Sequence, residues 1–125
     1  MTVRKPAVPE FRAARRHHVR DALPFIDWRF KQLAPEQHDA FQTFSRKVFA
    51  NGALATKTKQ LIAVAVAHVT QCPYCIRGHT KAAMREGATR NELMEAIWVA
   101  AEMRAGAAYA HSVLTLDEME REPFR

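Results

Sequence analysis

Residues 56–86 read TKTKQLIAVAVAHVTQCPYCIRGHTKAAMRE, and this stretch decides the fold. Its apolar centre, residues 61–67, has no polar face, which predicts a central helix that is buried on all sides. The valines would also suit a strand, but the length of the run, its alanines and its polar ends favour helix. We expect this helix to be capped by Thr56 and to end at about Thr70 or Gln71.

The only two cysteines, Cys72 and Cys75, lie at the start of the next predicted helix. Pro73 suits a first helical position and keeps the preceding residue out of the α region, so we expect Cys72 to be the N-cap. Cys75 then lies in the first turn, with His79 one turn further on. Backbone N–H groups, the helix dipole and a nearby imidazole all favour a thiolate, so this motif predicts a redox site.

Two other interpretations of the cysteines stay open. They can be an inert structural pair. They can also form a zinc site with His68 and His79, because the four residues follow one another at intervals of four, three and four. Zinc sites usually take their ligand pairs from separate elements, whereas these four residues surround one helix junction. The sequence therefore favours dithiol chemistry with no metal and no cofactor.

Proline, glycine and capping signals place the other helices. They are expected from Pro35 to about Asn51, from Pro73 to Glu86, and from Thr89 to about Leu114 with a bend or an interruption at Gly106. No strand pair with turn chemistry is found, so the fold class is all-α, a single-domain helical bundle. We divide the chain into a basic arm and packing segment (1–34), a core domain (35–116) and an acidic tail (117–125).

The N-terminal part of the chain is basic. Net charge is +6 in 125 residues, and residues 1–31 hold eight Lys/Arg against three acids. A short basic helix is expected over 11–19, followed by an apolar segment, 22–33, that Pro24 breaks. The arm lacks interleaved aromatic residues, so we predict no nucleic-acid partner. The apolar segment instead predicts packing against a neighbouring subunit, and hence a homo-oligomer.

The hydropathy pattern indicates the cellular compartment of the protein. No run of about 18 apolar residues is present to span a membrane. No apolar segment of the kind found in export signals follows the basic residues near the N-terminus. A CxxC pair in such a chain indicates a cytoplasmic redox protein.

Residues 56–62, 71–76, 79–80 and 87–89 together resemble the carboxymuconolactone decarboxylase superfamily. Within it they look like the CxxC-containing branch, the AhpD-like alkylhydroperoxidases, and the similarity covers roughly residues 35–112. The resemblance implies an all-helical fold that assembles into homotrimers or homohexamers. It also implies peroxidase and disulfide-reductase activity without metal or haem.

The resemblance assigns a role to each residue of the motif. Cys75 matches the peroxidatic cysteine, Cys72 matches the partner that closes the disulfide and meets the reductant, and His79 matches the motif histidine. The helix-cap argument alone favours Cys72 as the more acidic thiol. We nevertheless expect Cys75 to be the nucleophile, because His79 lies one turn away and can assist it.

One position departs from the family pattern. A glutamate is expected twelve residues before the first cysteine, where this chain has Gln60, and an amide cannot take a proton from a thiol. Gln60 can still orient a water or His79 by hydrogen bonding. His68, one turn before Cys72, is either a substitute base or a buried histidine with a structural hydrogen bond. Tyr74 also stands where the family can have a histidine.

These observations predict a thiol peroxidase that reduces small organic hydroperoxides or hydrogen peroxide. An external dithiol, on a lipoyl domain or a thioredoxin-like protein, would return its disulfide to thiols. The alternatives are a redox sensor or dithiol-exchange protein with little turnover, and a structural metal-binding protein. Lactone decarboxylation, suggested by the superfamily's name, does not need a CxxC pair.

Overall fold

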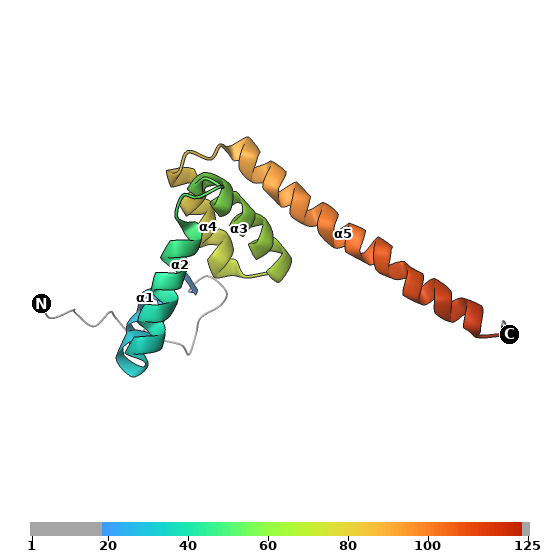
Figure 1. Cartoon of the computed structure of the whole chain (residues 1–125), viewed down its shortest axis with the longest axis horizontal. Helices are drawn as coiled ribbons and strands as arrows, with labels where there is room; N and C mark the ends of the chain where they lie inside the picture. The colour runs from blue at the N-terminus through green and yellow to red at the C-terminus, as the bar shows by residue number, and fades with distance from the viewer. Residues whose placement is uncertain (1–18, 124–125) are drawn as a thin grey trace, which may run out of the picture. The chain divides into compact units, whose positions relative to one another are not determined.

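A computed structural model describes residues 19–123, with side chains from residue 24 onward. Within that range the chain forms five α-helices and no strand, so the all-α prediction is confirmed (Figure 1). The chain divides into two compact units, the first ending at Gly52 and the second beginning at Ala53. The predicted helix over 11–19 falls almost entirely outside the described residues.

The first unit contains α1 (Val19–Leu33) and α2 (Pro35–Phe49), which are joined by Ala34 alone. Helix α1 runs through Pro24, so the expected break there is wrong. The proline removes one backbone hydrogen bond near the start of the helix and leaves the later turns intact. Pro35 occupies the first turn of α2 as predicted, a position where a missing N–H has no consequence.

The second unit contains α3 (Thr56–Thr70), α4 (Pro73–Arg85) and α5 (Arg90–Arg121), which pack around a small shared core. Each helix contributes one fully or almost fully buried residue, and together these are Val64, Ala83 and Leu93. Leu61, Ala88 and Ile97 pack against them. The core therefore fixes α3 against α4, and this contact positions the cysteine motif.

The corner between α3 and α4 is very short. Gln71 adopts a left-handed conformation with φ of 56°, and the Cys72 N–H donates to the Ala67 carbonyl oxygen at 3.1 Å. These features end α3 and redirect the chain within two residues. Gly87, with φ of 87°, follows α4 in the conformation that glycine adopts most readily.

Helix α3 differs from its prediction in two respects. Only Gln60, Val64 and Ala67 are buried, whereas Ile62 and Val66 are about half exposed, at 48% and 52%. The prediction of burial on all sides is therefore wrong for the chain on its own. The N-cap is also not Thr56 but the preceding alanine, which lacks a capping side chain, because the chain enters the helix one residue earlier than expected.

Helix α5 is a single helix of 32 residues. The predicted capping box is confirmed, since the Thr89 hydroxyl accepts from the Glu92 N–H at 3.1 Å and the Glu92 carboxylate accepts from the Thr89 N–H at 2.8 Å. The expected interruption at Gly106 and end near Leu114 are wrong. Strong helix formers follow the glycine, so one weak position does not stop the helix.

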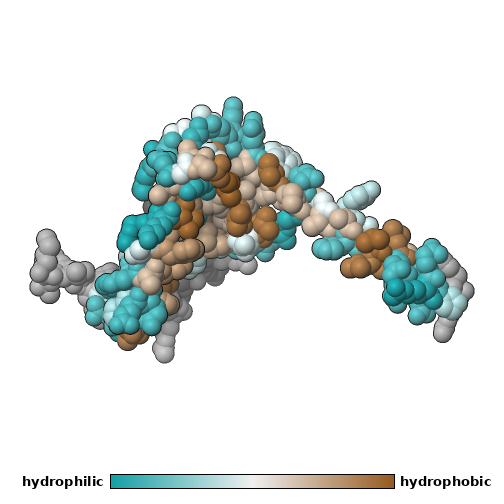
Figure 2. All heavy atoms as spheres, in the orientation of Figure 1, coloured by the Kyte–Doolittle hydropathy of each residue, from teal (hydrophilic) through white to brown (hydrophobic). Residues whose placement is uncertain are grey.

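Much of α5 has no cover from its own unit. Figure 1 shows its second half extending beyond α3 and α4, and every residue from 101 to 121 except Gly106 is exposed. Hydrophobic surface lies on this part of the helix (Figure 2), where Tyr109 is 84% exposed. No helix in residues 19–123 is long and apolar enough to cross a bilayer.

Candidate redox site

Cys72 and Cys75 form a disulfide at the N-terminus of α4. Their Cα atoms are 5.3 Å apart and both residues are half-buried. Cys72 is the N-cap, as predicted, and its Sγ accepts a hydrogen bond from the Cys75 N–H at 3.3 Å. The start of the helix therefore stabilises negative charge on the Cys72 sulfur when the disulfide is reduced.

His79 and Gln60 meet across α4 and α3. The Nδ1–H of His79 donates to Oε1 of Gln60 at 2.8 Å, and only 8% of Gln60 is exposed. Because a carbonyl oxygen only accepts, this bond fixes the proton on Nδ1, which leaves Nε2 as the basic nitrogen of the neutral ring. Partial burial lowers the pKa of His79, so the ring is neutral at pH 7 and able to take a proton. Of the two partners considered from the sequence for Gln60, a water or His79, the structure has the hydrogen bond with His79, which Gln60 accepts.

His68 lies on the last turn of α3 and is half-buried. Its Nδ1–H donates to the Val64 carbonyl oxygen, one turn earlier in the same helix, at 2.7 Å. This is the contact expected of a histidine with a structural hydrogen bond, the second of the two roles considered from the sequence.

The cysteine sulfurs are bonded to each other, and a zinc site would need them as separate thiolates. Between residues 19 and 123 no three His, Cys, Asp or Glu side chains gather in a way that could hold a metal ion. The disulfide at the corner of α3 and α4 is a group that can exchange electrons with other thiols.

The carboxymuconolactone decarboxylase family model matches residues 35–118, a span that includes α2 to α4 and most of α5. The chain belongs to this family. The resemblance found in the sequence is confirmed at this level, and the CxxC pair supports a place near the AhpD-like members.

Relatives of this family member are similar over most of their length. Uncharacterized protein 4 in the cox locus of Paracoccus denitrificans is 68% identical over 85 residues, which cover 66% of this chain and 77% of that protein. A crystal structure of a protein from Methanobacterium thermoautotrophicum has a TM-score of 0.65 at 36% identity, covering 69% of this chain and 97% of that one. An apo carboxymuconolactone decarboxylase family protein from Legionella pneumophila also has a TM-score of 0.65, at 32% identity, with coverages of 84% and 93%.

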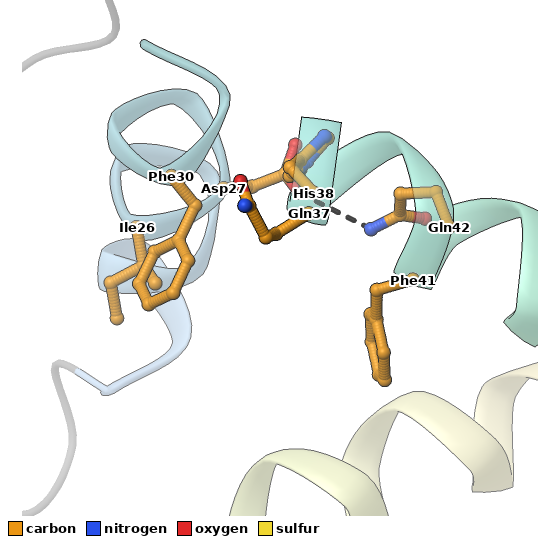
Figure 3. Close-up of a pocket in the computed structure, with 7 residues that line it drawn as sticks. All are labelled: Ile26, Asp27, Phe30, Gln37, His38, Phe41 and Gln42. Carbon is orange, nitrogen blue, oxygen red and sulfur yellow. Dashed lines mark hydrogen bonds and ion pairs between the residues drawn. The ribbon is translucent and has the colours of Figure 1, made fainter. Parts of the chain in front are cut away.

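The first unit of this family member contains a polar cluster that sequence reasoning missed. The two ring nitrogens of His38 donate to Asp27 at 2.8 Å and to Asp39 at 3.1 Å, and Lys31 pairs with Asp39. These hydrogen bonds raise the pKa of His38, Asp27 contributing most. The cluster borders a mostly apolar groove of about 460 Å³ (Figure 3). The groove is lined by Ile26, Asp27, Phe30, Gln37, His38, Phe41 and Gln42.

Proposed function

We propose that the protein is a thiol peroxidase that cycles between the Cys72–Cys75 disulfide and the free dithiol. The supporting observation is the disulfide itself, at a helix N-terminus and one turn from a neutral histidine whose orientation Gln60 holds. Family membership adds support, since the CxxC pair is the feature that the AhpD-like members share with this chain. The substrates we propose are hydrogen peroxide and small organic hydroperoxides.

The proposed reaction starts from the reduced protein. His79 takes the proton of the Cys75 thiol, and the thiolate attacks the terminal oxygen of the hydroperoxide. The O–O bond breaks, Cys75 becomes a sulfenic acid, and the alkoxide takes the proton from His79 to leave as an alcohol. Cys72 then attacks the sulfenic sulfur, which forms the disulfide and releases water.

The two cysteines have different surroundings, and both suit this order of events. The hydrogen bond from the Cys75 N–H to Cys72 Sγ favours the Cys72 thiolate, which the second step needs as its nucleophile. Cys75 lies one helical turn before His79, which places it to use the histidine in the first step. An external dithiol completes the cycle, which suits a reducing compartment such as the cytoplasm.

Serine substitutions test the roles of the cysteines. Cys75→Ser should abolish peroxide consumption, because a serine hydroxyl does not supply a nucleophile at neutral pH. Cys72→Ser should react once and leave a sulfenic acid on Cys75, which a dimedone-type reagent traps for mass spectrometry. Oxidation found on Cys72 in the Cys75→Ser protein would reverse the assignment.

We also propose that the active form is a homo-oligomer, a trimer or hexamer. Large apolar side chains are exposed on both units of the isolated chain, among them Phe41 and Phe44 on α2, Val66 on α3, and Trp98 and Tyr109 on α5. Exposed apolar surface of this extent is typical of subunit interfaces.

Gln60 supports a second candidate function. Its amide orients His79 but does not accept a proton, so the site lacks the extra base of the family pattern. A dithiol-exchange protein or redox sensor needs the disulfide but no such base. Stoichiometric disulfide formation without repeated turnover, in the presence of an effective reductant, would favour this candidate.

A further inference from the structure

Helix α4 has one strongly basic face. Arg77, Lys81 and Arg85 follow one another at intervals of four residues, so they lie on the same side of the helix, and all three are exposed. No Asp or Glu occurs from Pro73 to Arg85. None of the three cations pairs with an acid within the described part of the chain. We call these three residues the α4 basic face.

The charge on this face is not needed by the fold of the unit. The buried side of α4 is anchored by Ala83, away from the three cations. Adjacent like charges on a helix destabilise it by a few tenths of a kcal/mol per pair. The next acid along the chain, Glu86, follows the helix and is exposed. The face therefore offers an uncompensated positive charge to solvent.

Gly78 lies beside this face and gives an independent indication of an external contact. It is exposed in the interior of α4, and a Cβ built on it would meet nothing within 4 Å. A glycine in a helix interior is less favourable than alanine by roughly 0.8–1.0 kcal/mol. Packing against residues 19–123 thus gives no reason for the glycine. It leaves the helix backbone open to close approach by another molecule, three residues after Cys75.

We propose that the α4 basic face docks an acidic protein dithiol that reduces the Cys72–Cys75 disulfide. The proposal rests on the dithiol cycle of the proposed function. The helix rises about 1.5 Å per residue, so Arg77 lies about 3 Å and Arg85 about 15 Å beyond Cys75 along the axis. The helix also turns by about 100° per residue, so these cations lie on the side of α4 away from Cys75. A partner whose acidic surface meets them would bring its thiols around the start of the helix to the disulfide. Complementary charge would raise the rate of encounter.

The reduction step balances without a further reactant. A thiolate of the donor attacks the Cys72 sulfur, and Cys75 leaves as a thiolate. The second thiolate of the donor then attacks the donor sulfur that is bonded to Cys72, which closes the donor disulfide and frees the Cys72 thiolate. Two electrons pass to the protein, the donor becomes a disulfide, and the two donor protons end on the protein thiols or in solvent.

The test uses two synthetic peptides that carry the same dithiol, one flanked by glutamates and the other by lysines. Each reduces the oxidised full-length protein without peroxide, and acid quenching, alkylation and mass spectrometry give the rate. The flanking charges also change the reactivity of each peptide's thiols, so each peptide's rate is divided by its rate of reduction of a small neutral disulfide. A substitution can also change the reactivity of the protein disulfide, so each variant's rate is divided by its rate of reduction by dithiothreitol.

We expect the acidic peptide to reduce the protein about tenfold or more faster than the basic peptide at low salt, with the difference shrinking as salt is added. Lys81→Glu should remove much of this preference, and reversal of all three cations should invert it. Lys47→Glu on α2 is the matched control, an exposed lysine with the same change in charge, and should keep the preference.

Equal corrected rates for the two peptides would overturn the proposal, as would equal effects of Lys81→Glu and Lys47→Glu. A second outcome would also overturn it: the charge reversals abolish binding of a single-stranded oligonucleotide to the face but leave the reduction rates of both peptides unchanged. Because no peroxide is used, a protein without peroxidase turnover can still show the charge preference. The two proposals therefore fail independently.

Discussion

Replacing Gln60 by glutamate tests the proton path at the redox site. Gln60 is almost completely buried, and its Oε1 accepts from His79 Nδ1–H at 2.8 Å. Glutamate has nearly the same shape, so the new carboxylate would accept the same bond and add a negative charge. That charge opposes the burial that lowers the pKa of His79, and so makes the histidine a stronger base toward the Cys75 thiol.

The size of the effect follows from two opposing contributions. Unit charges about 4 Å apart attract by about 4 kcal/mol near a protein surface. Burial of the carboxylate offsets several kcal/mol of this. A net gain of about 1.4–2.8 kcal/mol corresponds to about tenfold to a hundredfold in rate, and the upper limit equals the low end of the roughly 10²–10⁴-fold that placed general bases contribute. Burial also raises the pKa of the new carboxyl group, so the gain should grow with pH.

The assay is the initial rate of peroxide consumption with excess dithiol, followed over roughly pH 6–9, where histidine and cysteine titrate. His68→Gln in the native background is the control. A large loss in that control, with no gain from Gln60→Glu, would mean that His68 already supplies the base. If neither substitution changes the rate, neither residue belongs to the proton path and the reasoning is refuted.

Three further predictions concern assembly and stability. Light scattering at micromolar concentration should show a trimer or hexamer, and a monomer would refute the inference from exposed apolar surface. The His38 ion pairs stabilise the hairpin of α1 and α2 fully below the unfolded-state pKa of about 6.5, and this contribution is lost as pH rises through the higher folded-state pKa. The denaturation midpoints of wild type and His38→Gln should therefore converge with increasing pH; a constant difference would contradict this. Thr89→Ala should lower the free energy of unfolding by about 1 kcal/mol, measured by urea denaturation, because it removes the cap of α5, whereas an unchanged midpoint would show that the capping box is not stabilising.

Local signals predicted the elements that carry the redox site. Pro35 and Pro73 mark helix starts and Gly87 a helix end, because their backbone preferences act within one or two residues. The same kind of signal failed at Gly106, where the helix-forming residues on both sides outweigh one glycine.

Contacts between distant residues were harder to predict. The pairing of His38 with Asp27 depends on two helices folding back at Ala34, which neither residue reveals alone. The hydropathy of α3 indicated burial on all sides, but it did not show that Ile62 and Val66 are about half exposed in the chain on its own. Local propensity determines the helices, whereas long-range packing determines the rest.

The disulfide closes a ring between residues only three positions apart. Restriction of the unfolded chain by so small a ring is worth only about 2 kcal/mol in the loop-entropy model, against about 4.7 kcal/mol for a loop of 100 residues. Oxidation and reduction should therefore change resistance to heat and proteases only modestly. In the proposed redox cycle, each reduction would remove only this small contribution, so the cellular lifetime of the protein should depend little on how often it turns over.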